Sequence, residues 1–142
     1  MITKHITNQS DLERAFDIRK TIFVEEQGVP LEDEFDEHEN FAQHVLVYYN
    51  SEPVGTGRIR FVNGVAKLER ICVLTSHRKC GLGKVIVETL EQIAREKGAL
   101  KSILHGQTQA QHFYEKLGYY NASDEFMEAG IPHLLMVKNL SL

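Results

Sequence analysis

A glycine-containing turn between an expected strand and an expected helix is the segment of this 142-residue chain best suited to chemistry. The turn reads Arg78-Lys79-Cys80-Gly81-Leu82-Gly83. Glycines let successive backbone N–H groups face one anion, and a helix N-terminus adds unpaired donors and the positive end of its dipole. Lys84 adds a further positive charge. The pattern predicts a phosphate-binding turn, but it also fits a tight bend in which the glycines only relieve strain.

The two common nucleotide-binding motifs fit this turn poorly. A Walker A loop requires Gly near position 78 and Ser or Thr at position 85, where this chain has Arg78 and Val85. A dinucleotide-binding turn requires a third glycine at position 86, where Ile86 stands. We therefore expect a phosphate ligand that is bound through neither motif.

Hydrophobic periodicity predicts the elements that position the turn. Helices are expected over residues 11–24, 84–97 and about 110–117. Strands are expected over residues 44–49, 54–62, 65–74, 101–105, 119–122 and 133–138. Ser10 and Glu13 have capping-box spacing, and Asn63-Gly64 is typical of a two-residue hairpin turn. The order predicts an α+β, or mixed α/β, fold in one domain over residues 1–142.

Composition narrows the class of partner. The formal net charge of −4 argues against nucleic-acid binding, which usually needs a basic face. We see no signal peptide and no apolar run of roughly 20 residues that could span a membrane. Cys72 and Cys80 have neither metal-site spacing nor a disulfide pattern. We expect a cytoplasmic protein with reduced cysteines, without a metal, a nucleic-acid partner or a membrane partner.

Two sequence patterns together resemble a known family. Val73-x4-Arg78-x-x-Gly81-x-Gly83 resembles motif A of the GNAT superfamily of acetyl-CoA-dependent N-acetyltransferases. The segment from Gln107 to Tyr119, with Ala110, Phe113, Tyr114 and Gly118, resembles its motif B. The element order also matches from Ile2 to Lys138. The resemblance implies the GNAT fold, a central mixed and mostly antiparallel sheet flanked by helices, with acetyl-CoA (coenzyme A) as cosubstrate and no metal.

A closer resemblance exists within the superfamily. Phe23-Val24-Glu25-Glu26-Gln27-Gly28-Val29-Pro30 and Gly130-Ile131-Pro132-His133 are similar to segments of a group of small, poorly characterised bacterial acetyltransferases. This group names no substrate. Many family members are dimers, so the resemblance leaves a homodimer open.

The resemblance also implies which residues contact the cofactor. Backbone groups at the end of the motif A strand would pair with the pantetheine arm, and the N–H groups from Lys79 to Lys84 would bind the pyrophosphate. Phe113 would pack beside the arm, and Gln107 stands where the family usually has Asn. The implied cofactor contacts are Ile71, Cys72, Val73, Arg78, Lys79, Cys80, Gly81, Leu82, Gly83, Lys84, Gln107, Phe113 and Tyr114.

Two residues are the implied catalytic groups. Tyr114 would protonate the departing thiolate, and the alternative is a core aromatic on a helix stripe. Glu69 would act as a base, because it lies four residues before Val73, where several family members carry one. Strand alternation would put Lys67, Glu69, Ile71 and Val73 on one face. The Asn63-Gly64 hairpin, however, places Arg58 opposite Glu69 and Arg60 opposite Lys67, which would lower the pKa of Glu69 and favour a structural role. His44, His105, His112 and His133 are alternative bases.

The acceptor site is expected beside the acidic stretch from Glu25 to Glu39, which contains no Lys or Arg. Carboxylates would attract a cationic amine, but the stretch also fits a solvated loop. The expected acceptor contacts are Glu26, Gln27, Asp36, Arg58 and His133. The leading hypothesis is acetyl transfer to a primary amine of a small molecule by direct attack in a ternary complex. The alternatives are peptide or protein N-acetylation and a non-catalytic CoA-binding module.

Overall fold

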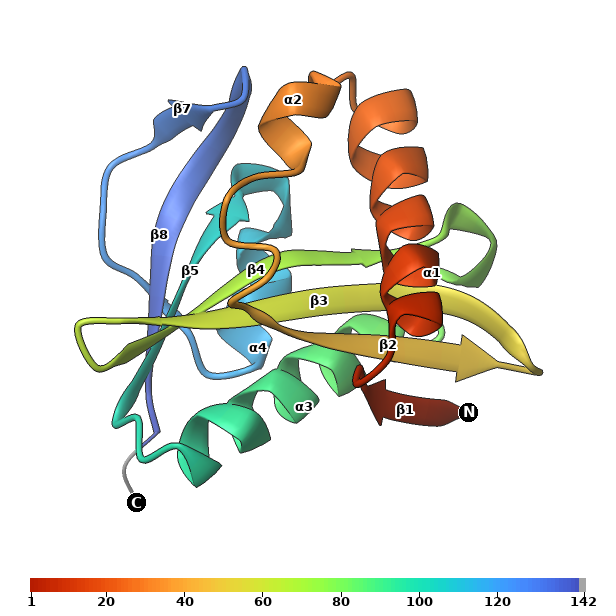
Figure 1. Cartoon of the computed structure of the whole chain (residues 1–142). Helices are drawn as coiled ribbons and strands as arrows, with labels where there is room; N and C mark the ends of the chain where they lie inside the picture. The colour runs from red at the N-terminus through yellow and green to blue at the C-terminus, as the bar shows by residue number, and fades with distance from the viewer. Residues whose placement is uncertain (141–142) are drawn as a thin grey trace.

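The computed structural model describes residues 1–140, which form an eight-stranded sheet with helices on both faces (Figure 1). The strand order is β1-β2-β3-β4-β5-β8-β6, with β7 paired to β8. The strands are β1 (Ile2–His5), β2 (Gln43–Tyr49), β3 (Glu52–Val62), β4 (Val65–Val73), β5 (Lys101–Gln107), β6 (Tyr120–Asn121), β7 (Phe126–Glu128) and β8 (Ile131–Asn139). Only β4 and β5 pair in parallel among these. The expected mixed, mostly antiparallel sheet is confirmed.

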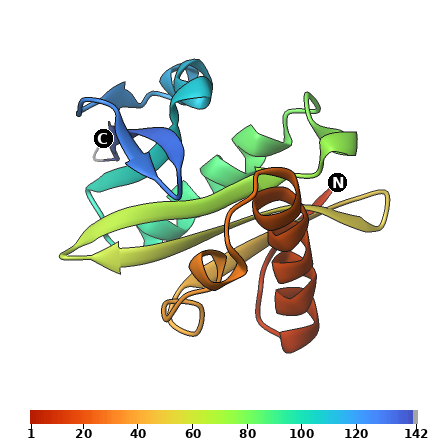
Figure 2. The same ribbon diagram turned by 90° about the horizontal axis from the view of Figure 1, so that it is seen from above.

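The helices divide between the two faces of the sheet. They are α1 (Gln9–Arg19), α2 (Leu31–Glu34), α3 (Leu82–Glu96) and α4 (Gln111–Lys116), with a π-helical segment η1 (Lys20–Glu26) after α1 and 3-10 turns over Thr75–His77 and Thr108–Ala110. Figure 2 shows α1 and α3 on opposite sides of the strands. A large apolar core lies between the sheet and α3, and a smaller one lies against α1. No helix within residues 1–140 is long and apolar enough to cross a membrane.

The start of α1 differs from the expected capping box. Asn8, not Ser10, is the N-cap, and its side-chain oxygen accepts a hydrogen bond from the Asp11 N–H at 2.7 Å. The Asn8 amide in turn donates to the Asp11 carboxylate at 3.1 Å. The prediction of Ser10 as the cap is wrong because Asn8, two residues earlier, supplies the side-chain oxygen that accepts a helix N–H.

The β3–β4 hairpin has the predicted turn and the predicted pairs. Asn63 and Gly64 have φ of 52° and 80°, as a two-residue turn requires. The register places Arg58 opposite Glu69 and Arg60 opposite Lys67, which confirms that prediction.

A β-bulge then interrupts β4. Thr56 pairs with Cys72 while Arg58 pairs with Glu69, so β4 carries one extra residue, and Arg70 has φ of 57°. The extra residue reverses the alternation beyond it. Ile71 and Val73 join the α3 core with Leu68, whereas Cys72 faces α1. The expectation that Glu69 shares a face with Ile71 and Val73 is therefore wrong.

The cleft of the molecule follows from the way β4 and β5 separate. They pair only from Ala66 to Leu68 and from Ser102 to Leu104. Beyond these residues β4 continues to Val73 and β5 to Gln107, with no pairing between them. The sheet is thus open where the two strands end, and helix α4 follows this end of β5 after one 3-10 turn.

Candidate active site

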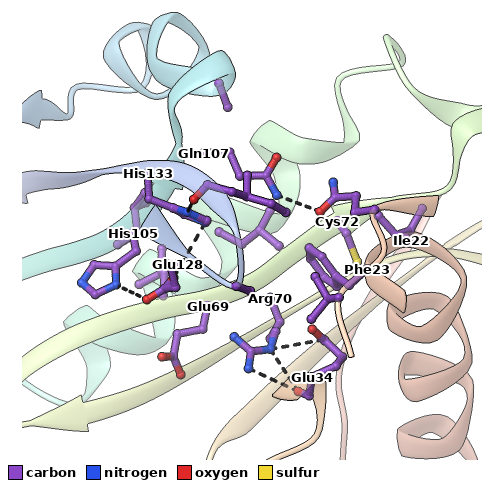
Figure 3. A pocket seen from close by; sticks show the side chains of 18 of the residues that line it. Ile22, Phe23, Glu34, Glu69, Arg70, Cys72, His105, Gln107, Glu128 and His133 are labelled. Atoms are coloured by element: carbon purple, nitrogen blue, oxygen red, sulfur yellow. Dashed lines mark hydrogen bonds and ion pairs between the residues drawn. The ribbon is translucent and has the colours of Figure 1, made fainter. Parts of the chain in front are cut away.

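The separation of β4 and β5 opens a cleft of about 740 Å³ (Figure 3). Its walls come from η1 and the stretch after it, from β4, from the end of β5, from α4 and from the β7–β8 hairpin. Of the residues expected to act, the cleft is lined by Glu26, Gln27, Asp36, Glu69, Ile71, Cys72, Val73, Arg78, Gly83, Gln107, Phe113, Tyr114 and His133. The side chains of Arg58, Lys79, Cys80, Leu82 and Lys84 do not line it.

The turn before α3 leaves a row of backbone donors free. Gly81 is the N-cap of α3 in the left-handed region, with φ of 76°, and no side chain caps the helix. Lys79 is also left-handed, with φ of 70°. Among the described residues, none of the N–H groups of residues 79–84 donates to a protein acceptor; the first to do so is that of Val85, to the Gly81 carbonyl. Such a row at a helix N-terminus suits a phosphate.

Arg78 fixes this turn to both neighbouring walls. Its Nε donates to the Val73 carbonyl at 3.0 Å, at the end of β4. Its guanidinium also pairs with Glu26 of η1 at 3.0 Å. Glu26 is therefore already engaged by a cation, which weakens the expectation that it receives a cationic acceptor.

Glycine at position 83 allows α3 and α4 to approach closely. A Cβ at Gly83 would lie 3.0 Å from the Phe113 ring, so a larger residue would push this ring aside. Phe113 in turn makes an edge contact with Tyr114, with ring centroids 5.0 Å apart. The two motif segments are thus in direct contact, and together they form one side of the cleft.

Tyr114 lies at the base of the cleft with 8% of its surface exposed. Its ring packs on Gly106, where a Cβ would lie 3.1 Å from the ring. Within residues 1–140 its hydroxyl has no hydrogen-bond partner, and burial raises the pKa of the phenol. Tyr114 therefore stays protonated and can donate to a ligand group that develops negative charge.

Glu69 is held by three cations. Its carboxylate lies 2.9 Å from Arg58, 2.8 Å from Arg60 and 3.4 Å from Lys67. Burial acts to raise the pKa of Glu69, but the Arg60 hydrogen bond and the charges of Arg58 and Lys67 together lower it. The predicted Arg58–Glu69 pair is confirmed, and a carboxylate with a lowered pKa is a weak base.

Part of the acidic stretch pairs with arginines on the sheet and on α1. Arg19 pairs with Glu34 at 2.9 Å and with Glu39 at 2.7 Å. Arg70 pairs with Glu34 at 3.2 Å, as Figure 3 shows. Burial acts to raise the pKa of Glu39, but Arg19 and Arg58 lower it to about 2. These acids therefore hold part of the stretch against the sheet, whereas Glu25, Glu32 and Glu37 are exposed, as in a solvated loop.

Arg58 is the centre of this network. Its side chain is 1% exposed and pairs with Asp36 at 2.9 Å, Glu39 at 3.0 Å and Glu69 at 2.9 Å. The expectation that Arg58 contacts the acceptor is not supported, because the side chain is buried and does not line the cleft. Asp36 does line the cleft, but Arg58 donates to both of its carboxylate oxygens.

Two expected contacts meet each other across the cleft. The Gln107 amide donates to the Gln27 side-chain oxygen at 2.8 Å and accepts from Gln109 at 2.9 Å. This bridge joins the residue after η1 to the end of β5. The Gln107 amide therefore has two protein partners here, and a cofactor contact would have to replace one of them.

The β7–β8 hairpin adds a residue that the sequence did not reveal. Glu128 lines the cleft and lies 2.9 Å from His105 and 3.7 Å from His133. Figure 3 shows both histidines directed toward it. The signal in the sequence was the pair Ala129-Gly130, whose φ values of 52° and 75° form a second two-residue turn. Within residues 1–140, no group of three or more His, Cys, Asp or Glu side chains could hold a metal ion.

Comparison with known proteins identifies the family. Residues 12–119 match the model of the acetyltransferase (GNAT) family. The chain belongs to this family. A Bacillus subtilis protein named "putative acetyltransferase" is 58% identical over 141 residues, covering 97% of this chain and 96% of the relative. The chain is thus an acyltransferase, and acetyl transfer is its activity at the level of the family.

Solved structures of the GNAT family share the fold. A "putative N-acetyltransferase" from Lactobacillus plantarum has a TM-score of 0.89 and 28% identity, with 99% of each chain covered. An aminoglycoside 6′-N-acetyltransferase, solved in complex with coenzyme A, has a TM-score of 0.76 and 17% identity, with 99% of this chain and 97% of that one covered. The second likeness supports the fold alone.

Proposed function

We propose that this GNAT protein transfers the acetyl group of acetyl-CoA to a primary amine of a small molecule, by direct attack in a ternary complex. The observation that carries the proposal is the row of free N–H groups from residue 79 to residue 84 at the mouth of a cleft that contains Tyr114. The row suits the pyrophosphate of CoA, and the phenol lies further inside, where the reactive end of an extended cofactor would arrive.

Three features of the cleft fit coenzyme A. The first turn of α3, beside the free N–H groups, contains no acidic residue that would repel phosphate. The exposed edge of Phe113, 37% accessible, offers an apolar surface to the pantetheine arm. The end of β4, from Ile71 to Val73, lines the same cleft and no longer pairs with β5, so its backbone groups on that side can meet the arm. All three features belong to the residues that the motifs singled out.

Direct attack is favoured by the state of the cysteines. Cys72 lines the cleft, but burial raises the pKa of its thiol, so it remains protonated and unreactive. Cys80 is exposed in the phosphate turn and does not line the cleft. An acyl-enzyme on cysteine therefore has no suitable nucleophile, and the amine itself would attack the thioester. Both cysteines are free, which fits the proposed cytoplasmic location.

Tyr114 would supply the proton that the leaving thiolate needs. The amine forms a C–N bond at the thioester carbon, the C–S bond breaks, and the sulfur takes the phenolic proton. The raised pKa of the phenol keeps this proton in place until negative charge develops on sulfur.

The test is thiol release from acetyl-CoA with n-butylamine, putrescine and glucosamine, for the wild type and for Tyr114→Phe. We expect the substitution to lower kcat by about 100-fold without changing CoA affinity, because a positioned acid contributes roughly that factor. Tyr120→Phe, at an exposed tyrosine of β6, is the matched control and should leave kcat unchanged. CoA binding without thiol release for any amine, or full activity of Tyr114→Phe, would contradict the proposal.

A further inference from the structure

The carboxylates that line the cleft differ in their partners. They are Glu26, Asp33, Glu34, Asp36, Glu69 and Glu128. Four of them pair with arginine, as described above. Asp33 lies on the exposed surface of α2. Glu128 has no arginine partner among the described residues, because its hydrogen-bond and ion-pair contacts are His105 and His133. It is therefore the carboxylate at the β7–β8 end of the cleft that remains able to attract a cation.

The two histidines leave one oxygen of Glu128 and one ring nitrogen of His133 open. His105 Nδ1 donates to Glu128 Oε1 at 2.9 Å. His133 Nδ1 lies 2.6 Å from the Ile131 carbonyl, which can only accept, so Nδ1 carries the proton and Nε2 of the neutral ring carries a lone pair. That Nε2 is 3.7 Å from Glu128 Oε2, too far for a hydrogen bond between them. An ammonium nitrogen placed beside both atoms could donate to each.

The side chains around His133 fix its orientation. The ring is buried and stacks on Phe126, with centroids 6.1 Å apart and an interplanar angle of 23°. Besides the two histidines, the positive charge of Lys67 on β4 acts on Glu128, but Lys67 pairs with Glu69 at 3.4 Å. Glu128 and His133 are thus presented from two paired strands, β7 and β8.

Strand alternation places this pair on the face of β5 opposite Tyr114. Gly106 packs against the Tyr114 ring, so its neighbours His105 and Gln107 point to the other face. His133 is the register partner of Gln107 on β8. An amine held there would approach from the face opposite α4, through the gap where β4 and β5 no longer pair.

We propose that Glu128 and His133 receive the acceptor: Glu128 Oε2 binds the ammonium charge, and His133 Nε2 takes the proton that must leave before the nitrogen can attack. This rests on the proposed function and names its acceptor as a cationic primary amine. The first N–H proton passes to His133. The second, lost as the tetrahedral intermediate collapses, replaces the proton that Tyr114 gives to the thiolate. The products are the amide, CoA as thiol and one proton released from His133.

The test compares Glu128→Gln and His133→Asn in the thiol-release assay with whichever panel amine the wild type uses. Glu128→Gln should raise the KM for the amine by about tenfold or more, with kcat and CoA affinity nearly unchanged, since a charge-assisted hydrogen bond is lost. His133→Asn keeps a donor for the Ile131 carbonyl but has no base, and should lower kcat by about 100-fold with little change in KM. Glu125→Gln is the control, because Glu125 pairs with Thr108 outside the cleft.

A binding measurement separates this inference from the proposed function. We would titrate n-butylammonium chloride into the CoA-bound protein and follow the ring ¹⁵N resonances of His133 by NMR. The wild type and Glu125→Gln should show a saturable shift that Glu128→Gln lacks. If no amine causes thiol release, the proposed function is contradicted. The NMR titration then tests by itself whether Glu128 binds the ammonium group. An equal shift in Glu128→Gln, no shift in the wild type, or unchanged kinetics in both variants would overturn the inference.

Discussion

The two sides of the cleft use polar groups in opposite ways. On the side of α3 and α4, the N–H groups of residues 79–84 and the Tyr114 hydroxyl have no hydrogen-bond partner within residues 1–140. On the side of the acidic stretch, Glu34, Asp36 and Glu39 are fully engaged by Arg19, Arg58 and Arg70. Polar groups without a protein partner can bind a ligand, whereas the ion-paired carboxylates hold in place the wall against which the ligand binds. The comparison teaches that charge density in a sequence does not by itself locate a binding site.

The largest expected effect comes from removing Arg58 from the ion pairs of the acidic stretch. Arg58→Met would leave the carboxylates of Asp36, Glu39 and Glu69 without their central partner, and should lower the free energy of unfolding by about 3–5 kcal/mol. Arg60→Met, at a more exposed arginine that contacts only Glu69 of these three, should cost about 1 kcal/mol or less. Urea unfolding measures both values. Equal losses for the two variants would show that the network is not centred on Arg58.

Low pH should weaken the ion pairs of the acidic stretch and lower the free energy of unfolding. The folded pKa of Glu39, about 2, lies below its usual value of 4.5, so its contribution to stability is present above pH 4.5 and lost as the pH falls toward 2. The pKa values of Asp36 and Glu69 are lowered as well, while burial raises that of Glu34 and partly offsets the trend. We expect the free energy of unfolding to fall by about 2–3 kcal/mol between pH 5 and pH 2.

The pH effect has an internal control. Urea unfolding at several pH values should give a smaller decline for Arg58→Met than for the wild type, because Glu39 loses one of its two arginines in this variant. A wild-type stability that is constant across this range would contradict the assignment of Glu39 as an ionised, arginine-bound acid.

The smallest expected effect concerns the bridge between the two sides. Gln107→Asn shortens the amide by one methylene, so it should lose its hydrogen bond to Gln27. The cost to stability should be about 1 kcal/mol or less. The freed amide should improve CoA affinity by up to about threefold, which isothermal titration calorimetry can measure. Gln27→Ala removes the same bridge from the other side and should act in the same direction; a loss of CoA affinity in both variants would mean that the bridge helps to form the site.

Local signals in the sequence predicted the parts of the fold that depend on local chemistry. Asn63-Gly64 fixed the β3–β4 register, and from this register followed the Arg58–Glu69 pair. The bulge at Arg70 could not be predicted, because its left-handed conformation occurs at a residue that rarely adopts it, inside an uninterrupted β pattern. This single residue reversed the faces of Ile71 and Val73.

The candidate site was predictable on one side only. The motif residues from Arg78 to Gly83 and around Tyr114 lie together because they flank the opening between β4 and β5. The pairing of Glu34, Asp36 and Glu39 with arginines was not predicted, because Arg19, Arg58 and Arg70 come from distant parts of the chain. Glu128 was missed because β7 has only three residues, too few for a periodic signal.

The most direct test of the account asks whether the free N–H groups before α3 bind coenzyme A. Gly81 and Gly98 flank the same helix, both have positive φ, and a Cβ at either would meet nothing within 4 Å. Gly81→Val and Gly98→Val should therefore impose similar backbone strain, but only the first distorts the donor row. We predict that Gly81→Val raises the dissociation constant of CoA by about 100-fold, as expected when charge-assisted hydrogen bonds are lost, while Gly98→Val leaves it unchanged. Equal affinity of the two folded variants for CoA would contradict the account.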